Sequence, residues 1–164
     1  MRIQVGEALP DCELMRWTGS EMLRRSSRDL MGSGRCMIVG TVGAFTPVCT
    51  RSHLADYLPV IPTLRQAGSI DRFYCIGVVD PFVFQAWGAQ LDAHETIEMW
   101  ADPFAAFSRA IDITADLTKA GLGLRSGRYS MVTFDGRVER LNVEEDPTIV
   151  SVSGVETLRR QLAS

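Results

Sequence analysis

The sequence predicts an α/β fold in which a central mixed sheet is covered by helices on both faces. Three observations lead to this fold class. Two short apolar runs, 35–39 and 73–79, are typical of strands that are buried on both faces of a sheet. Apolar residues elsewhere recur at the three- and four-residue spacing of amphipathic helices. Finally, an Asp-Gly pair at 135–136 separates two strand-like segments, which predicts an antiparallel hairpin.

Length and composition limit the class of protein. A chain of 164 residues and 18.1 kDa has the size of one domain, and we interpret residues 1–164 as a single domain. With 46% hydrophobic and 23% charged residues, the composition is globular. The net charge of −3 disfavours nucleic-acid binding, and no stretch approaches the roughly 20 apolar residues of a membrane span. The first residues contain no apolar signal region, so we expect a cytoplasmic protein.

The first half of the chain alternates strands and helices. Residues 11–17 and 21–25 flank Gly19-Ser20 and predict a hairpin at the sheet edge. A helix is expected after Cys49, with Pro59 and Pro62 bending or splitting it. Two further helices are expected later in the chain. The apolar face of the first helix comprises Leu54, Tyr57, Leu58, Ile61 and Leu64, that of the second Phe84, Trp87 and Leu91, and that of the third Phe104, Phe107 and Ile111.

The chain ends with a hairpin and a helix. Residues 128–134 and 137–143 are the expected strands on either side of Asp135-Gly136. The last helix buries Val155, Leu158 and Leu162, and the spacing of Ser153 and Glu156 predicts a capping box at its start.

A Thr-Pro or Asp-Pro pair follows an apolar or extended segment three times, at 46–47, 80–81 and 102–103. Each pair combines a capping side chain with a proline suited to the first helical position, and so predicts a helix start. Open α/β sheets place their functional sites at the carboxyl ends of strands, where such helices begin. Only the first pair has a cysteine within one turn, namely Cys49.

Cys49 is the best nucleophile candidate in the chain. If the helix begins at Pro47, Cys49 is its third residue, near the positive end of the helix and near N–H groups that lack helical acceptors. This position favours the thiolate, which is the reactive form. The alternative is that Cys49 is simply a small buried residue, and that Thr46 is an ordinary helix cap. The four cysteines form no C-x-x-C pair, and His53 and His94 are far apart in sequence, so no metal site is expected.

Three blocks in order resemble the peroxiredoxins of the peroxiredoxin-5 type. They are GTVGAFTPVCTRSHLADYL (40–58), CIGVVDPFVFQAWG (75–88) and KAGLGLRSGRYSMVTFDGRVERLNVEE (119–145), so the resemblance covers residues 35–162. The resemblance implies a thioredoxin-like fold. It also implies a thiol-dependent peroxidase that reduces hydrogen peroxide and small alkyl hydroperoxides through a Cys49 sulfenic acid.

The resemblance assigns roles to individual residues. Cys49 matches the peroxidatic cysteine, Thr46 the hydroxyl that hydrogen-bonds the peroxide, and Arg128 the catalytic arginine. Arg125 is close to Arg128 in sequence and is assigned a supporting role. His53 matches a family histidine, for which a structural hydrogen-bonding role is at least as good an interpretation as a catalytic one.

The sequence departs from the family pattern at two points. Val42 stands where the motif P-x-x-x-T-x-x-C has its proline, which predicts a weakened peroxidase. The alternative function is a thioredoxin-fold redox sensor or interaction protein with weak or no turnover. In addition, no cysteine follows Cys75. We therefore expect a one-cysteine mechanism recycled by an external thiol, either glutathione with glutaredoxin or thioredoxin. Cys36 and Cys75 are interpreted as core residues, and Cys12 stays open as a resolving cysteine.

The resemblance also implies a homodimer formed through the active-site edge. Candidate contacts are Phe45, Pro47, Phe82 and Trp87, although Trp87 on its helical stripe also fits the core. No metal, haem or nucleotide cofactor is expected. The glycines at 121–124 do not indicate a nucleotide site, because they lack a phosphate-loop lysine and follow a helix instead of preceding one.

Overall fold

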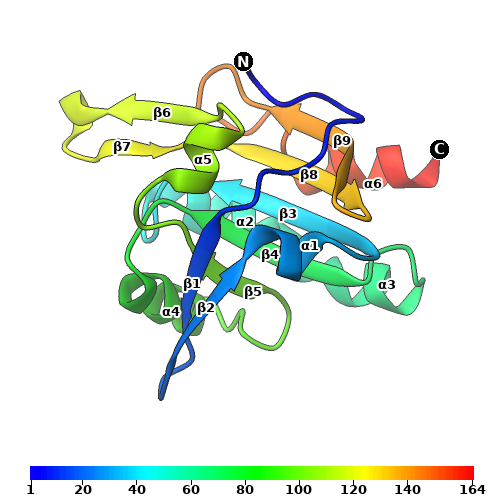
Figure 1. Ribbon diagram of the computed structural model, residues 1–164, viewed down its shortest axis with the longest axis horizontal. Helices are drawn as coiled ribbons and strands as arrows, with labels where there is room; N and C mark the ends of the chain where they lie inside the picture. The colour runs from blue at the N-terminus through cyan, green and yellow to red at the C-terminus, as the bar shows by residue number, and fades with distance from the viewer.

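The computed structural model describes residues 1–164 and contains a seven-stranded mixed sheet with the strand order β2-β1-β5-β4-β3-β8-β9 (Figure 1). The strands of this sheet are β1 (Glu13–Trp17), β2 (Met22–Ser26), β3 (Arg35–Thr41), β4 (Arg72–Gly77), β5 (Glu98–Ala101), β8 (Tyr129–Phe134) and β9 (Arg137–Val143). A separate two-stranded hairpin, β6 (Thr114–Leu117) and β7 (Gly123–Ser126), extends beyond the end of the main sheet (Figure 1).

The helical segments are short. They are α1 (Ser27–Met31), the π-helical turn η1 (Cys49–His53), α2 (Leu54–Tyr57), α3 (Ile61–Gln66), α4 (Pro81–Gln90), α5 (Ala106–Ala110), the 3₁₀ turn η2 (Thr118–Ala120) and α6 (Val155–Ala163). None of them is long and apolar enough to cross a membrane.

Strand β3 is an inner strand of the sheet, between β4 and β8, and it decides where the site is formed. It pairs in parallel with β4 and antiparallel with β8, and β4 pairs in parallel with β5. The mixed sheet expected from the sequence is confirmed. Because β8 runs antiparallel, its first residues lie beside the last residues of β3, with Gly40 opposite Tyr129. Residues that follow β3 and residues that precede β8 therefore meet at the same edge.

The alternation of side chains along the strands produces two cores, one on each face of the sheet. Met37, Val39 and Cys75 point to one face, where α2, α3, α4 and α6 cover them. Cys36, Ile38 and Tyr74 point to the other, which is covered by α1, α5 and the N-terminal segment. Cys49 belongs to the first core and is fully buried there.

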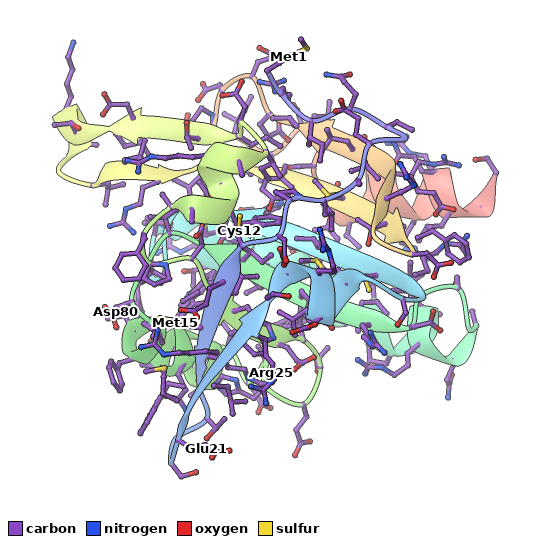
Figure 2. The ribbon with its side chains drawn as sticks, in the orientation of Figure 1. Met1, Cys12, Met15, Glu21, Arg25 and Asp80 are labelled. Carbon is purple, nitrogen blue, oxygen red and sulfur yellow. The ribbon has the colours of Figure 1, made fainter.

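Several sequence predictions are confirmed in detail. The edge hairpin is β1–β2, and the helix after Cys49 is split into α2 and α3. The turn between β8 and β9 has positive φ at Asp135 (47°) and Gly136 (77°), as a two-residue hairpin turn requires. Asp80, labelled in Figure 2, caps α4 by accepting from the Val83 N–H.

Three local predictions are wrong. Phe104 is outside any helix and 74% exposed, because the helix predicted there begins only at Ala106. Asp102-Pro103 therefore starts no helix directly; the Asp102 carboxylate instead accepts from the N–H groups of Phe107 and Ser108. The capping box at Ser153 is absent, because the Ser153 hydroxyl donates to Glu144 and not to the helix backbone. Strand β5 and the β6–β7 hairpin are not predicted from the sequence.

Candidate active site

Cys49 is placed by the turn that connects β3 to the following helix. The helical conformation begins at Pro47, and Cys49 is the third helical residue, as the sequence predicts. From Cys49 the backbone continues as a single π-helical turn, in which the Leu54 N–H donates to the carbonyl oxygen of Cys49. Such turns are rare and occur frequently at functional sites. The Phe45 backbone just before the helix has φ of 64°, a strained conformation for a residue with a side chain.

Thr46 precedes the helix, but its side chain does not cap it. The Thr46 hydroxyl donates to the carbonyl oxygen of Gly43 at 2.6 Å. The cap predicted from the sequence is thus replaced by a bond that closes the loop. Because the hydroxyl hydrogen is committed to Gly43, the lone pairs of Oγ1 stay available as acceptors.

Arg128 contacts the sulfur directly. Its Nη1 donates to Cys49 Sγ at 3.2 Å, and its Nε donates to the carbonyl oxygen of Pro147 at 2.9 Å. The side chain is among the largest that are fully enclosed, with 2% residual exposure. A buried guanidinium is a permanent cation with a rigid set of donors, so the hydrogen bond to a thiolate is charge-assisted. The structure thus brings Arg128 into hydrogen-bond contact with Cys49, the two residues that the family resemblance pairs.

Val42 is the residue that stands in place of the motif proline. It is 5% exposed and packs in the same core as Cys49, so it keeps an apolar cover on this side of the sulfur. Its backbone N–H donates to no acceptor of the chain. Proline has no such N–H, and the position is therefore one that a proline would fit without losing a hydrogen bond.

His53 and Tyr57 anchor the helical segment that carries Cys49. The Tyr57 hydroxyl and His53 Nε2 both donate to the carbonyl oxygen of Ser153, at 2.5 and 3.3 Å. Burial, and then the positive charge of Arg128, lower the pKa of His53 to about 3, so its imidazole is neutral at pH 7. The contacts of His53 support the structural interpretation and not proton transfer at neutral pH.

Arg125 does not reach the sulfur. Its guanidinium donates to the carbonyl oxygens of Leu122 and Val78, so it fastens the β6–β7 hairpin to the segment between β4 and α4. The two arginines lie three residues apart, but Arg125 sits within β7 whereas Arg128 precedes β8. The supporting role assigned to Arg125 is therefore, at most, an indirect one.

The other three cysteines lie on different faces of the sheet. Cys36 is buried in the core on the face opposite to Cys49, and Cys12, labelled in Figure 2 just before β1, packs against that same opposite core. Cys75 alone shares the core of Cys49. Burial strongly raises the pKa of Cys75, so it stays a thiol. All four cysteines are free.

Three of the four candidate dimer contacts are exposed. Phe45 and Phe82 are 47% and 55% exposed, and Pro47, two residues after Phe45, is exposed as well. Trp87 is fully buried, and its Nε1 donates to the hydroxyl of Thr50 at 3.1 Å. Its assignment as a dimer contact is therefore wrong; Trp87 links α4 to the helix that carries Cys49. No group of histidine, cysteine, aspartate and glutamate side chains is placed to hold a metal.

Sequence reasoning missed the residues that support this centre. The carbonyl oxygen of Pro147 holds Arg128, and Tyr57 holds the helix. A main-chain acceptor leaves no signal in a sequence. The helical spacing predicts Tyr57 as a core position, and only the presence of its hydroxyl indicates a polar contact.

Comparison with known proteins gives the family. The redoxin family model matches residues 4–158. The chain is 34% identical to Peroxiredoxin-2F, mitochondrial, from Oryza sativa subsp. japonica, over 82% of this chain and 68% of that one. The structure of reduced Prx3 from Vibrio vulnificus in complex with H2O2 superposes with a TM-score of 0.90 at 35% identity, covering 98% and 96% of the two chains. Peroxiredoxin 5 from Alvinella pompejana gives 0.83 at 27% identity over 98% of each chain. The chain therefore belongs to the redoxin family, and within it to the peroxiredoxins.

Proposed function

We propose that Cys49 is the sulfur with which this thiol-dependent peroxidase reduces peroxides, and that Arg128 and Thr46 act with it. The observation that carries the proposal is the 3.2 Å hydrogen bond from the Arg128 guanidinium to Cys49 Sγ in an enclosed site. The Prx3 structure with bound H2O2 supports hydrogen peroxide as a substrate, and small alkyl hydroperoxides share its O–O bond.

The chemical step is a displacement at oxygen. The Cys49 thiolate attacks one peroxide oxygen, the S–O bond forms, and the O–O bond breaks. The leaving oxygen departs with the electron pair and takes up a proton, giving water or an alcohol and a Cys49 sulfenic acid. Negative charge moves from sulfur toward the leaving oxygen, and the Arg128 donors stabilise that charge as it develops. The Thr46 oxygen, whose hydrogen points to Gly43, can accept from the peroxide O–H.

Recycling is proposed to use an external thiol. A first thiol displaces water from the sulfenic acid and forms a mixed disulfide, and a second thiol then releases Cys49 and forms the thiol's own disulfide. Glutathione with glutaredoxin, or thioredoxin, has the required chemistry. The sheet separates Cys12 and Cys36 from Cys49, and Cys75 is an enclosed, protonated thiol, which supports a one-cysteine cycle. A reducing compartment such as the cytoplasm suits this cycle.

A homodimer at the active-site edge is proposed from the exposed aromatic residues there. Phe82 packs against Trp17 with ring centroids 5.1 Å apart, and both Phe82 and Phe45 leave about half of their surface open. A partner that covers these rings would remove apolar surface from water. Sedimentation analysis of wild-type protein and of Phe82→Ser tests this: dissociation of the variant is expected.

The test of the reaction measures turnover. With excess dithiothreitol, the wild-type chain is expected to consume many equivalents of peroxide, and Cys49→Ser none. Cys12→Ser and Cys75→Ser are matched controls that should keep turnover, with mass spectrometry of the treated wild type showing +16 or +32 Da on the Cys49 peptide, as one or two added oxygens require. A Cys49–Cys75 disulfide would overturn the one-cysteine cycle.

The sensor alternative rests on Val42. Consumption of a single equivalent of peroxide followed by arrest would favour the sensor over the enzyme, and restoration of turnover in Val42→Pro would assign the loss to this residue. The burial of Val42 against the Cys49 core supports turnover, because the apolar cover of the site is retained.

A further inference from the structure

Glu144 is a buried carboxylate that plays no part in the reaction described above. It follows β9 directly and is 5% exposed. Five donors converge on its two oxygens: the N–H groups of Ser151, Val152 and Ser153, and the hydroxyls of Ser151 and Ser153, all within 2.6–2.8 Å. All five come from the 145–153 loop, which connects β9 to α6.

The same loop holds both partners of the reaction centre. The carbonyl oxygen of Pro147 accepts from Nε of Arg128, whose Nη1 contacts the sulfur. The carbonyl oxygen of Ser153 accepts from Tyr57 and His53, on the helical segment that carries Cys49. The loop thus fixes the guanidinium near one end and the sulfur-bearing helix at the other.

Glu144 is also joined to Arg128 through the backbone. The Glu144 N–H donates to the carbonyl oxygen of Arg128 at 2.9 Å, next to the pairing of Tyr129 with Val143. Glu144, whose carboxylate holds the loop, is therefore also hydrogen-bonded through its backbone to Arg128. This places Glu144, Arg128 and the loop in one connected unit.

We propose that Glu144 is a positioning residue for the Cys49–Arg128 pair: by holding the 145–153 loop, it keeps the guanidinium in line with the sulfur. The proposal rests on the proposed function, in which Arg128 stabilises the charge that moves across the peroxide. Four of the five donors bond Oε1, and the Ser151 hydroxyl bonds Oε2, so the position uses an acceptor at both oxygens. A glutamine can keep an oxygen toward the four donors, but it removes the negative charge that strengthens these bonds and replaces the acceptor of the Ser151 hydroxyl by an NH2 group.

The experiment compares Glu144→Gln with Glu145→Gln. Glu145 is the neighbouring residue with a side chain that is 94% exposed, so its substitution is a matched control. The measured quantities are the second-order rate constant for oxidation of Cys49 by H2O2, its pH profile, and the rate of alkylation of Cys49 by iodoacetamide, a reagent with no O–O bond to polarise. All are measured at 25 °C on protein shown to be folded by circular dichroism.

For Glu144→Gln we expect the peroxide rate constant to fall by about 10- to 100-fold, with alkylation at high pH changed by less than about threefold, because the guanidinium is displaced and the sulfur is not. The acid limb of the pH–rate profile should move to higher pH. Glu145→Gln should match the wild type. Glu144→Asp, which keeps the charge on a shorter side chain, should recover part of the rate.

A structural role alone would lower the melting temperature of Glu144→Gln and leave the rate constant and the pH profile of the folded protein unchanged, and this result would overturn the proposal. Arg128→Met serves as the reference: if it too keeps the wild-type rate, the proposed function of Arg128 fails, independently of Glu144. Should Glu144→Gln not fold, the double variant Ser151→Ala, Ser153→Ala removes the two hydroxyl donors and keeps the carboxylate. It is expected to shift the rate constant in the same direction by a smaller factor, and an unchanged rate constant would again contradict the proposal.

Discussion

Arg128 and Cys49 are 79 positions apart in the sequence and 3.2 Å apart at Nη1 and Sγ. The topology of the sheet produces this meeting. Cys49 follows the carboxyl end of β3, and Arg128 precedes the antiparallel strand β8, which starts beside that end. A buried cation and a buried sulfur then form a charge-assisted contact with little water around it.

Removing the guanidinium should reduce the reaction with peroxide more than any change at the second arginine. For Arg128→Met we expect the rate constant with H2O2 to fall by about 10²- to 10³-fold, as for loss of a donor to a developing oxyanion. Arg125→Met is the matched control, because Arg125 bonds only to the carbonyl oxygens of Leu122 and Val78. Stopped-flow measurement of Cys49 oxidation gives both values. Equal losses in the two variants would contradict the assignment of roles.

Much of this arrangement could be predicted from sequence. Apolar runs located β3 and β4, and the Asp135-Gly136 pair located the β8–β9 hairpin, which Arg128 directly precedes. These signals are local, since alternation and turn residues act over a few positions. The identification of Arg128 itself came from the family resemblance.

The supporting contacts could not be predicted. Two sets of hydrogen bonds depend on how the 145–153 loop folds back: those from residues 151–153 to Glu144, and that from Arg128 to Pro147. No sequence pattern in these residues indicates that their donors surround a carboxylate. The same fold-back explains the wrong capping box, because Glu144 competes for the Ser153 hydroxyl. Similarly, β5 has only four residues, and polar residues flank it, so the apolar run is too short to predict a strand.

Val42→Pro should increase the peroxidase rate. The Val42 N–H has no acceptor in the chain, so a proline would remove an unsatisfied donor from a buried position beside the Cys49 core. We expect a gain of up to about tenfold in the rate constant with H2O2, equivalent to about 1.4 kcal/mol. Val42→Ala, which keeps the N–H and removes apolar bulk, should instead lower it. A lower rate in the proline variant would show that valine is the better residue here.

Gly40 should not tolerate a side chain. A Cβ at Gly40 would lie 2.0 Å from Cε1 of Tyr129, which is fully buried on β8. The ring would have to move, and Tyr129 directly follows Arg128. We expect Gly40→Ala to destabilise the fold by about 2 kcal/mol or more and to slow Cys49 oxidation in the protein that still folds. Gly68→Ala, at a position where no atom lies within 4 Å but φ is +71°, is a control for the general cost of replacing glycine. Urea unfolding measures both free energies.

The buried imidazole of His53 should make the protein sensitive to acid well above the range in which its carboxylates titrate. Burial, with the charge of Arg128, lowers the pKa of His53 to about 3 from 6.5, so the unfolded chain binds a proton at this residue that the folded chain excludes. Stability therefore falls as the pH is lowered from 6.5 toward 3, by up to about 1.4 kcal/mol per pH unit.

Glu144 contributes to the same trend only at lower pH. Burial alone would raise its pKa, but the hydrogen bonds from Ser151 and Ser153 outweigh burial and lower it to about 2 from 4.5. That stabilisation is complete above pH 4.5 and is lost between pH 4.5 and 2. The interval from pH 6.5 to 4.5 therefore isolates His53. There, His53→Gln should flatten the dependence of the unfolding free energy on pH, whereas Glu144→Gln should leave its slope as in the wild type. If the unfolding free energy of His53→Gln depends on pH as steeply as that of the wild type, then His53 already carries a proton in the folded protein. This result would contradict the assignment of a neutral His53 whose Nε2 donates to Ser153.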